Sequence, residues 1–179
     1  MKKTVIYLII IFSWLSAYSQ SDLDKSLDNV KSIELPIIDS IGHILNSQSI
    51  VIDSTSWNNL ELDTLEKFNE QFNYSIRGYW KIQNSKILLI KRASTEENIH
   101  WVVLFYENTL SDWLMTAYDN SEGFLSINSH INWDRVIIHS WNEFADSKRI
   151  IKEYHIEYTE KNSIKFIERK TVSEDLIEK

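Results

Sequence analysis

The feature that most constrains this sequence is a hydrophobic period of two, which starts at Tyr74 and continues almost to the C-terminus. Apolar and polar side chains alternate over Tyr74–Gln83. Because successive side chains of a β-strand point to opposite faces of a sheet, this period predicts strands. The breaks between alternating segments are short and rich in Asn, Asp and Ser, which suit tight turns and leave no room for crossover helices. The sequence therefore predicts an antiparallel arrangement.

The segments after Tyr74 predict seven or eight strands. One hairpin joins Tyr74–Gln83 to Ile87–Lys91 over Asn84-Ser85. Ile99–Tyr106 is apolar on both faces, which is typical of a central strand or of one covered by a second layer. The other predicted strands are Asp112–Tyr118, Gly123–Ile127, Arg135–Trp141, Ile150–Tyr158 and Ile164–Thr171. The predicted fold class is mainly β: a single antiparallel meander forming a sandwich or a small curled barrel, with one or two short N-terminal helices.

The clearest predicted helix is Asp63–Phe72. Asp63 could accept hydrogen bonds from the first free amides, and Glu66 could reach back to the amide of Asp63, as in a capping box. Four apolar side chains fall on one stripe of this segment: Leu62, Leu65, Phe68 and Phe72. We expect this face to dock onto an apolar surface, with the helix covering one face or one end of the sheet.

Two further N-terminal segments precede this helix. Ser49–Asp53 predicts a short strand. Around Pro36 two alternatives stay open: a strand over Ile33–Ile38, which Pro36 excludes from the centre of a sheet, or a helix that begins at Pro36. Ser21–Ser32 is polar with a narrow apolar stripe, so it predicts a short surface helix or a loose arm.

The N-terminus predicts export. Lys2 and Lys3 precede the apolar run Val5–Leu15, and Ala17 and Ser19 are small enough for a signal-peptidase site. We expect a signal peptide over residues 1–19, a polar arm over 20–32, one β-rich domain over 33–172 and a polar tail over 173–179. An uncleaved anchor is the alternative, although the uncharged stretch is at the short limit for a membrane span. The mature protein is then periplasmic or secreted, with no membrane contact.

Composition excludes several classes of protein. The chain has no cysteine, which excludes disulfide scaffolds, thiolate zinc sites and cysteine nucleophiles. Its 3 glycines and 1 proline leave no material for a glycine-rich phosphate loop. The net charge of −7 becomes −9 without residues 1–19, which opposes binding to nucleic acid.

The residues that could carry chemistry form no recognisable catalytic pattern. The histidines lack the helical spacing of metal ligands, and a site from His130, Asp134 and His139 is weakened because Asp134 and His139 would face opposite sides of a strand. We therefore predict no metal and no cofactor. No serine lies in a G-x-S-x-G turn. Acidic side chains are abundant, but most of them lie in turns, so we expect a protein that is not an enzyme.

The aromatic content provides the candidate binding residues. Trp80 and Trp101 lie on apolar faces and are assigned to the core. The candidate ligand-binding residues are Trp57, which we expect in a loop, Tyr79, Trp133, His139 and Trp141. Rings flanked by Asn and Asp can stack on sugars or hold a hydrophobic peptide anchor, whereas the alternative for each ring is core packing.

Several short patterns also occur in order along the chain: Leu35-Pro36, Tyr74-x-Ile76-x-Gly78-x-x-Lys81, Lys86-Ile87-Leu88-Leu89 and Tyr118-Asp119-x-x-Glu122-Gly123. With these patterns, residues 33–169 resemble small exported bacterial proteins of uncharacterised β-rich families. The resemblance implies a β-rich exported domain and defines no catalytic or binding residue.

The sequence supports three hypotheses of function. The first is an exported, non-enzymatic binding or interaction domain of the bacterial cell envelope, with an envelope glycan or protein as its partner. The second is an envelope hydrolase that acts on glycan or peptide through an Asp/Glu pair. The third is an inhibitor or immunity-type protein whose acidic surface suits a basic target.

Overall fold

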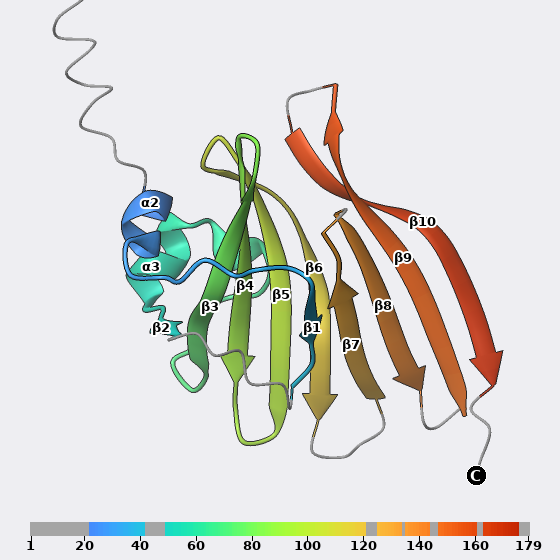
Figure 1. Ribbon diagram of the computed structural model, residues 1–179. Helices are drawn as coiled ribbons and strands as arrows, with labels where there is room; N and C mark the ends of the chain where they lie inside the picture. The colour runs from blue at the N-terminus through green and yellow to red at the C-terminus, as the bar shows by residue number, and fades with distance from the viewer. Residues whose placement is uncertain are drawn as a thin grey trace, which may run out of the picture.

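The computed structural model describes residues 22–41, 49–120, 125–133, 135–143, 147–160 and 163–175. Within these ranges the chain forms a single antiparallel 10-stranded sheet that is not closed into a barrel. Strands β2 to β10 follow one another in chain order across the sheet, and β1 pairs with β7 (Figure 1). The predicted mainly-β meander is confirmed.

Strands β4 to β10 are longer than the sequence alone indicates, whereas β3 has its predicted length and β1 and β2 are shorter than predicted. Their bounds are β1 Ile37–Asp39, β2 Ile50–Val51, β3 Asn73–Ile82, β4 Ser85–Ala93, β5 Glu97–Tyr106, β6 Thr109–Asn120, β7 Leu125–Ile131, β8 Val136–Glu143, β9 Lys148–Thr159 and β10 Ser163–Asp175. The helices are α2 Asp22–Leu27, α3 Ser54–Asn59 and a 3-10 turn, η1, at Leu62–Thr64. β10 curls back toward β6, where Phe166 N donates to Asp112 Oδ2 over 2.9 Å.

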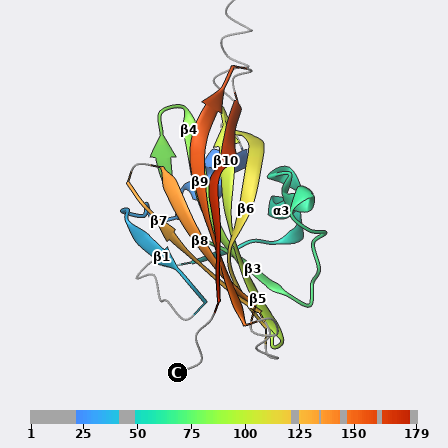
Figure 2. The ribbon, with the colours of Figure 1, turned by 90° about the vertical axis from the view of Figure 1, so that its right-hand side faces the viewer.

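The central strands β4 and β5 are buried on both faces, as predicted for Ile99–Tyr106. On one face Leu88 and Trp101 join the core that α2 and α3 cover; we call it the helix-side core. On the other face Leu89 and Val102 join a second core with β1 and the strands β8 to β10. In Figure 2, β1 and α3 lie on opposite sides of the sheet. The predicted core positions of Trp80 and Trp101 are confirmed, with exposures of 6% and 2%.

The helix predicted at Asp63–Phe72 is wrong; only η1 forms there, and the longer helix is α3. Asp53 caps α3, accepting a hydrogen bond from Ser56 N over 2.7 Å. Glu66 bonds to the sheet instead, with Tyr74 Oη at 2.8 Å. The apolar stripe still docks onto the helix-side core, as predicted, because those contacts need no regular helix: its members are Leu62, Leu65, Phe68 and Phe72.

The N-terminal residues wrap around one edge of the sheet. Helix α2 packs Leu23 and Leu27 into the helix-side core, so the helix alternative for the arm is correct. Residues 31–36, which we call the strap, then pass the edge of β3, where Ile33 N donates to Tyr79 O over 2.8 Å. The strap crosses the opposite face of the sheet and leads into β1 (Figure 1). Around Pro36 a strand forms, as in the first alternative, but its bounds are Ile37–Asp39 and not Ile33–Ile38, because residues 33–36 form the strap.

Gly78 lies where the strap meets β3. A Cβ atom at this position would lie 2.3 Å from Ile33 Cγ1 and 3.2 Å from the backbone oxygen of Lys31. Real Cβ atoms do not approach other atoms so closely, so only glycine lets the strap pass at this distance.

Bulges redirect side chains near the place where β7 separates from β6 and pairs with β1 instead. The pairing register shifts at Arg77 in β3 and at Thr116 in β6. Among the described residues, β6 pairs with β7 only through Tyr118↔Ile127 and Asp119↔Ser126. Beyond these pairs β7 pairs with β1 instead, with Asp39 opposite Ser129. Bulges of this kind increase the local twist and re-aim side chains.

The first hairpin turn and the C-terminal tail differ from their predicted positions. The first hairpin turn is Gln83-Asn84, because Ile82 pairs with Ser85. β10 extends to Asp175, so Ser173–Asp175 belong to the sheet and not to a tail. The predicted signal peptide, the end of the tail and Asp134 lie outside the described residues.

Candidate functional site

The apolar groove of this protein runs across four neighbouring strands and has a volume of about 340 Å³. We call it the aromatic groove. Its walls are Trp113, Leu114, Met115 and Tyr118 from β6, Leu125 and Ile127 from β7, His139 and Trp141 from β8, and Tyr154 from β9. Ligand sites in proteins are of this size, and most are apolar with a few placed polar groups.

The groove lies where the two cores approach each other: Met115 and Tyr118 pack against the helix-side core, whereas Leu114 and Tyr154 pack against the second core. Trp113 pairs across the strands with Val103, and Met115 pairs with Trp101, and both partners belong to the helix-side core. Helices α2 and α3 lie near β2 and β3, far from β7, β8 and β9 (Figure 1). The groove therefore joins the edges of both cores on strands β6 to β9, away from the strands that the helices cover.

His139 is a neutral member of this surface. Its side chain is only 4% exposed. Burial, reinforced by the positive charge of Lys152, lowers the pKa of His139 to about 4, so the imidazole is uncharged at neutral pH. Its ring centroid lies 6.4 Å from that of Trp141 and 6.0 Å from that of Tyr154. The imidazole thus packs as one ring of an aromatic group.

Two groove residues lack contacts that their side chains could make among the described residues. The Trp113 side chain is 36% exposed, although tryptophan is among the most apolar residues. The indole Nε1 of Trp141 is buried and has no acceptor among the described residues. A buried donor without an acceptor is costly, and an occupant of the groove could supply the missing oxygen.

The structure divides the ligand-binding residues that the sequence indicates. His139 and Trp141 line the aromatic groove together. Trp133 is 69% exposed and lines a different cleft with Arg135. Tyr79 is half-buried against the helix-side core. Trp57 is fully buried in α3, so its predicted loop position is wrong; its indole Nε1 donates to Glu66 O over 3.2 Å.

Sequence reasoning missed Trp113, Tyr118 and Tyr154 as groove residues. The hydrophobic alternation of each strand assigns each of these side chains to one face of the sheet; Tyr154, for example, shares the face of Ile156. The sequence carries no signal for the bulges and the divided β6–β7 pairing that bring these rings together.

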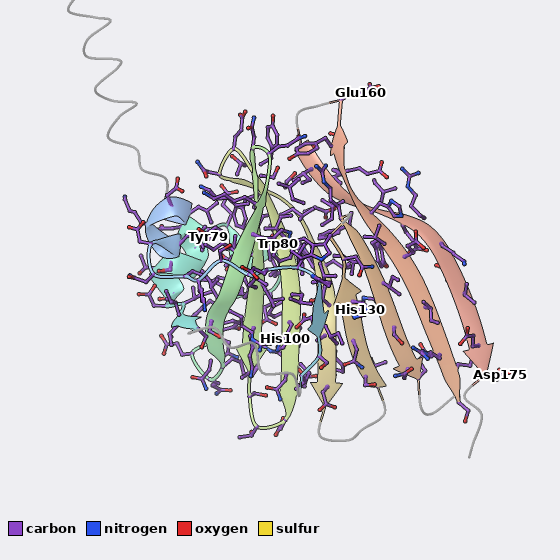
Figure 3. The ribbon with its side chains drawn as sticks, in the orientation of Figure 1. Tyr79, Trp80, His100, His130, Glu160 and Asp175 are labelled. Carbon is purple, nitrogen blue, oxygen red and sulfur yellow. The ribbon has the colours of Figure 1, made fainter. Side chains whose placement is uncertain are left out.

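A buried polar cluster lies where β1 meets the sheet. His100 Nδ1 is 2.7 Å from Asp39 Oδ1, and Thr116 Oγ1 donates to Asp39 Oδ2 over 2.6 Å (His100 is labelled in Figure 3). Arg77, redirected by its bulge, places Nη1 3.3 Å from the same imidazole nitrogen. The threonine hydroxyl is bonded to the carboxylate and not to the imidazole, so this is not a nucleophile–base arrangement. The cluster fixes β1 on the sheet.

A second polar cluster holds residues 65–72 against the sheet. Arg92 bonds both Glu66 and Glu97. Tyr74 donates to Glu66, and Tyr118 donates to Glu97, each over 2.8 Å. Both carboxylates are therefore occupied by partners, whereas a general acid needs a proton of its own and a path to substrate.

The described residues contain no group of three or more side chains suited to hold a metal ion. No helix in those same ranges is both long enough and apolar enough to cross a bilayer. Comparison of the chain with protein-family models, with curated proteins and with solved structures found no match.

Proposed function

We propose that this protein is a non-enzymatic binding domain that holds an apolar segment of a polypeptide partner in the aromatic groove. The observation that carries the proposal is the convergence of Trp113, His139, Trp141 and Tyr154 on one apolar groove. Binding energy at protein interfaces concentrates in a few buried aromatic and aliphatic contacts, and a groove of this composition can receive them.

The chemistry of the groove favours a polypeptide over a glycan. A saccharide carries hydroxyl groups around its ring and needs several polar partners, whereas the groove offers two tyrosine hydroxyls, one neutral imidazole and two indole N–H groups among otherwise apolar walls. A peptide segment presents apolar side chains next to backbone carbonyls. One such carbonyl would accept the hydrogen bond from Trp141 Nε1, which has no acceptor among the described residues.

Two arguments support binding without catalysis. The imidazole in the groove is neutral and packed between rings. Ser129 Oγ lies 3.4 Å from His139 Nδ1, but this serine is buried, donates its proton to Thr116 O and does not line the groove, so it is not placed as a nucleophile. The paired carboxylates Glu66 and Glu97 both serve Arg92, in a different cluster.

The proposal can be tested with the tripeptide acetyl-Leu-Phe-Leu-amide. We expect its titration to move the indole N–H resonance of Trp141 downfield in nitrogen-edited NMR spectra, because the N–H gains an acceptor. Trp113→Ala and Trp141→Ala should each weaken binding about tenfold, as expected for loss of an interface ring. Trp133→Ala, outside the groove, is the matched control. An unchanged Trp141 resonance, or equal affinity in all variants, would overturn the proposal.

We also propose that the protein is exported before it acts. The support is the basic start, the apolar run and the small residues at Ala17 and Ser19. An envelope or extracellular polypeptide is then the partner.

A further inference from the structure

A second cleft of about 500 Å³ lies where the strap passes the end of the β3–β4 hairpin. We call it the strap cleft. Three segments that are far apart in the sequence line it: the strap, the hairpin turn around Gln83, and the turn before β8 that carries Trp133 and Arg135. It shares no lining residue with the aromatic groove, so a ligand bound here does not depend on the function proposed for the groove.

Trp133 gives the cleft an exposed flat ring. Its side chain is 69% exposed, against 0–6% for Trp57, Trp80 and Trp101. An open indole at the wall of a cleft leaves its flat face accessible to a ligand bound there. The face of a tryptophan ring suits a ligand with an apolar face and polar edges.

The polar side chains of the cleft are available for hydrogen bonds. Glu34 and Gln83 are exposed, and neither side chain has a hydrogen-bond partner among the described residues. The carboxylate offers two acceptors, and the amide offers both donors and an acceptor. The buried indole N–H of Trp80, which also lines the cleft, has no acceptor in the described part of the chain.

Arg135 is held in place at the same cleft. Its backbone oxygen accepts from Ile156 N over 3.0 Å, and its guanidinium lies 5.9 Å from the centre of the Tyr158 ring. Its backbone has a φ of 67°, which an L-residue adopts only under constraint. The contact with the Tyr158 ring places the guanidinium as a planar donor at the cleft.

We propose that the strap cleft binds a saccharide. A pyranose ring has an apolar face of C–H groups, which would stack on Trp133, and hydroxyl groups at its rim. Those hydroxyls need donors and acceptors side by side, which Arg135, Gln83 and Glu34 supply. A purely apolar ligand would leave these groups unpaired, and a simple anion would gain nothing from the exposed ring.

The test uses two saccharides of similar size, neutral chitotriose and the carboxylated trigalacturonic acid, in titrations followed by calorimetry and by tryptophan fluorescence. We expect at least one of them to bind with a millimolar or tighter Kd. Trp133→Ala should weaken that binding at least tenfold, and Gln83→Ala several-fold. Trp113→Ala in the aromatic groove is the matched control and should bind as the wild type does. Preference for the acidic saccharide would assign its carboxylate to Arg135.

Two results would overturn the saccharide site. One is the absence of binding by both saccharides at 10 mM or more, on the order of the weakest useful affinities. The other is binding that Trp133→Ala and Gln83→Ala leave unchanged. Because Trp133 and Gln83 are exposed, both variants should fold normally, and unchanged urea unfolding will establish that.

Discussion

Asp39 Oδ1 lies 2.7 Å from His100 Nδ1, and the two side chains, 61 positions apart in the sequence, are both buried. Asp39 belongs to the three-residue strand β1, and His100 belongs to the central strand β5. A strand of this length contributes few backbone hydrogen bonds. The side-chain hydrogen bonds of Asp39 to His100 and Thr116 therefore contribute much of the free energy that holds the strap and β1 on the sheet.

Replacing Asp39 should strongly destabilise the protein. Asp39→Ala leaves His100 and Thr116 without their shared acceptor, and loss of one partner of a buried pair costs about 3–5 kcal/mol. Thr116→Val removes a single hydrogen bond and should cost about 1–2 kcal/mol. Urea unfolding measures both, with Asp63→Asn, on an exposed residue, as the control. A change below about 0.5 kcal/mol for Thr116→Val would contradict the role assigned to the cluster.

Gly78→Ala should destabilise the protein because its Cβ collides with Ile33. The expected cost is about 1–3 kcal/mol, as for other overpacked sites. Ile33→Ala removes both side-chain atoms that the new Cβ would meet, at 2.3 and 2.4 Å. The cost of Gly78→Ala should therefore be smaller in the Ile33→Ala background. A double-mutant cycle measures this coupling, and strictly additive effects would show that the strap does not pass at this distance.

Stability should fall as the pH decreases from 6.5 to 4 because of His139. The folded protein holds the pKa of His139 near 4, below the ordinary 6.5, so in this window the unfolded chain binds a proton that the folded one does not. The loss amounts to roughly 3 kcal/mol by pH 4. His139→Gln should reduce this pH dependence, measured by urea unfolding across the window. His130→Gln, on an exposed histidine of β7 (Figure 3), should leave it unchanged; parallel curves for wild type and His139→Gln would refute the assignment.

Tyr74→Phe should weaken the attachment of residues 65–72 to the sheet. The Tyr74 hydroxyl donates to Glu66 over 2.8 Å, and burial together with this bond raises the pKa of the phenol. Loss of a hydrogen bond to a charged acceptor costs about 1.5–3 kcal/mol. Amide exchange in residues 65–72 should accelerate. Tyr79→Phe is the matched control, because the Tyr79 hydroxyl has no hydrogen-bond partner among the described residues; equal effects of the two variants would be inconsistent with this attachment.

Expression in cells with an active secretion pathway should yield a mature chain that begins at Gln20. The prediction rests on the small residues Ala17 and Ser19 ahead of the cleavage position. Intact mass measurement of protein from the periplasm or medium identifies the first residue. Ala17→Arg and Ser19→Arg should block processing, whereas Tyr18→Phe, at the position between them, should not. A protein that keeps Met1 after purification would exclude cleavage.

Sequence reasoning located the strands well and the N-terminal elements poorly. The alternation over Tyr74–Gln83 was sufficient to predict β3, because a strand requires only that successive side chains point to opposite faces of the sheet. The capping pattern of Asp63 and Glu66 failed as a helix signal, because Glu66 has stronger partners in Tyr74 and Arg92. Local propensity determines the secondary structure of a segment only where no tertiary contact stabilises its side chains more strongly.

The sequence by itself determined that this chain is a mainly-β antiparallel meander, because a period of two and short polar turns are local properties. It also determined that Trp80 and Trp101 are core residues. Tertiary structure alone decided that His139 and Trp141 line one groove with Trp113, while Trp133 lies at another cleft and Trp57 is buried. Strand alternation assigns a side chain to a face, whereas bulges, the divided β6–β7 pairing and the crossing of the strap determine its neighbours, and these depend on contacts between distant segments.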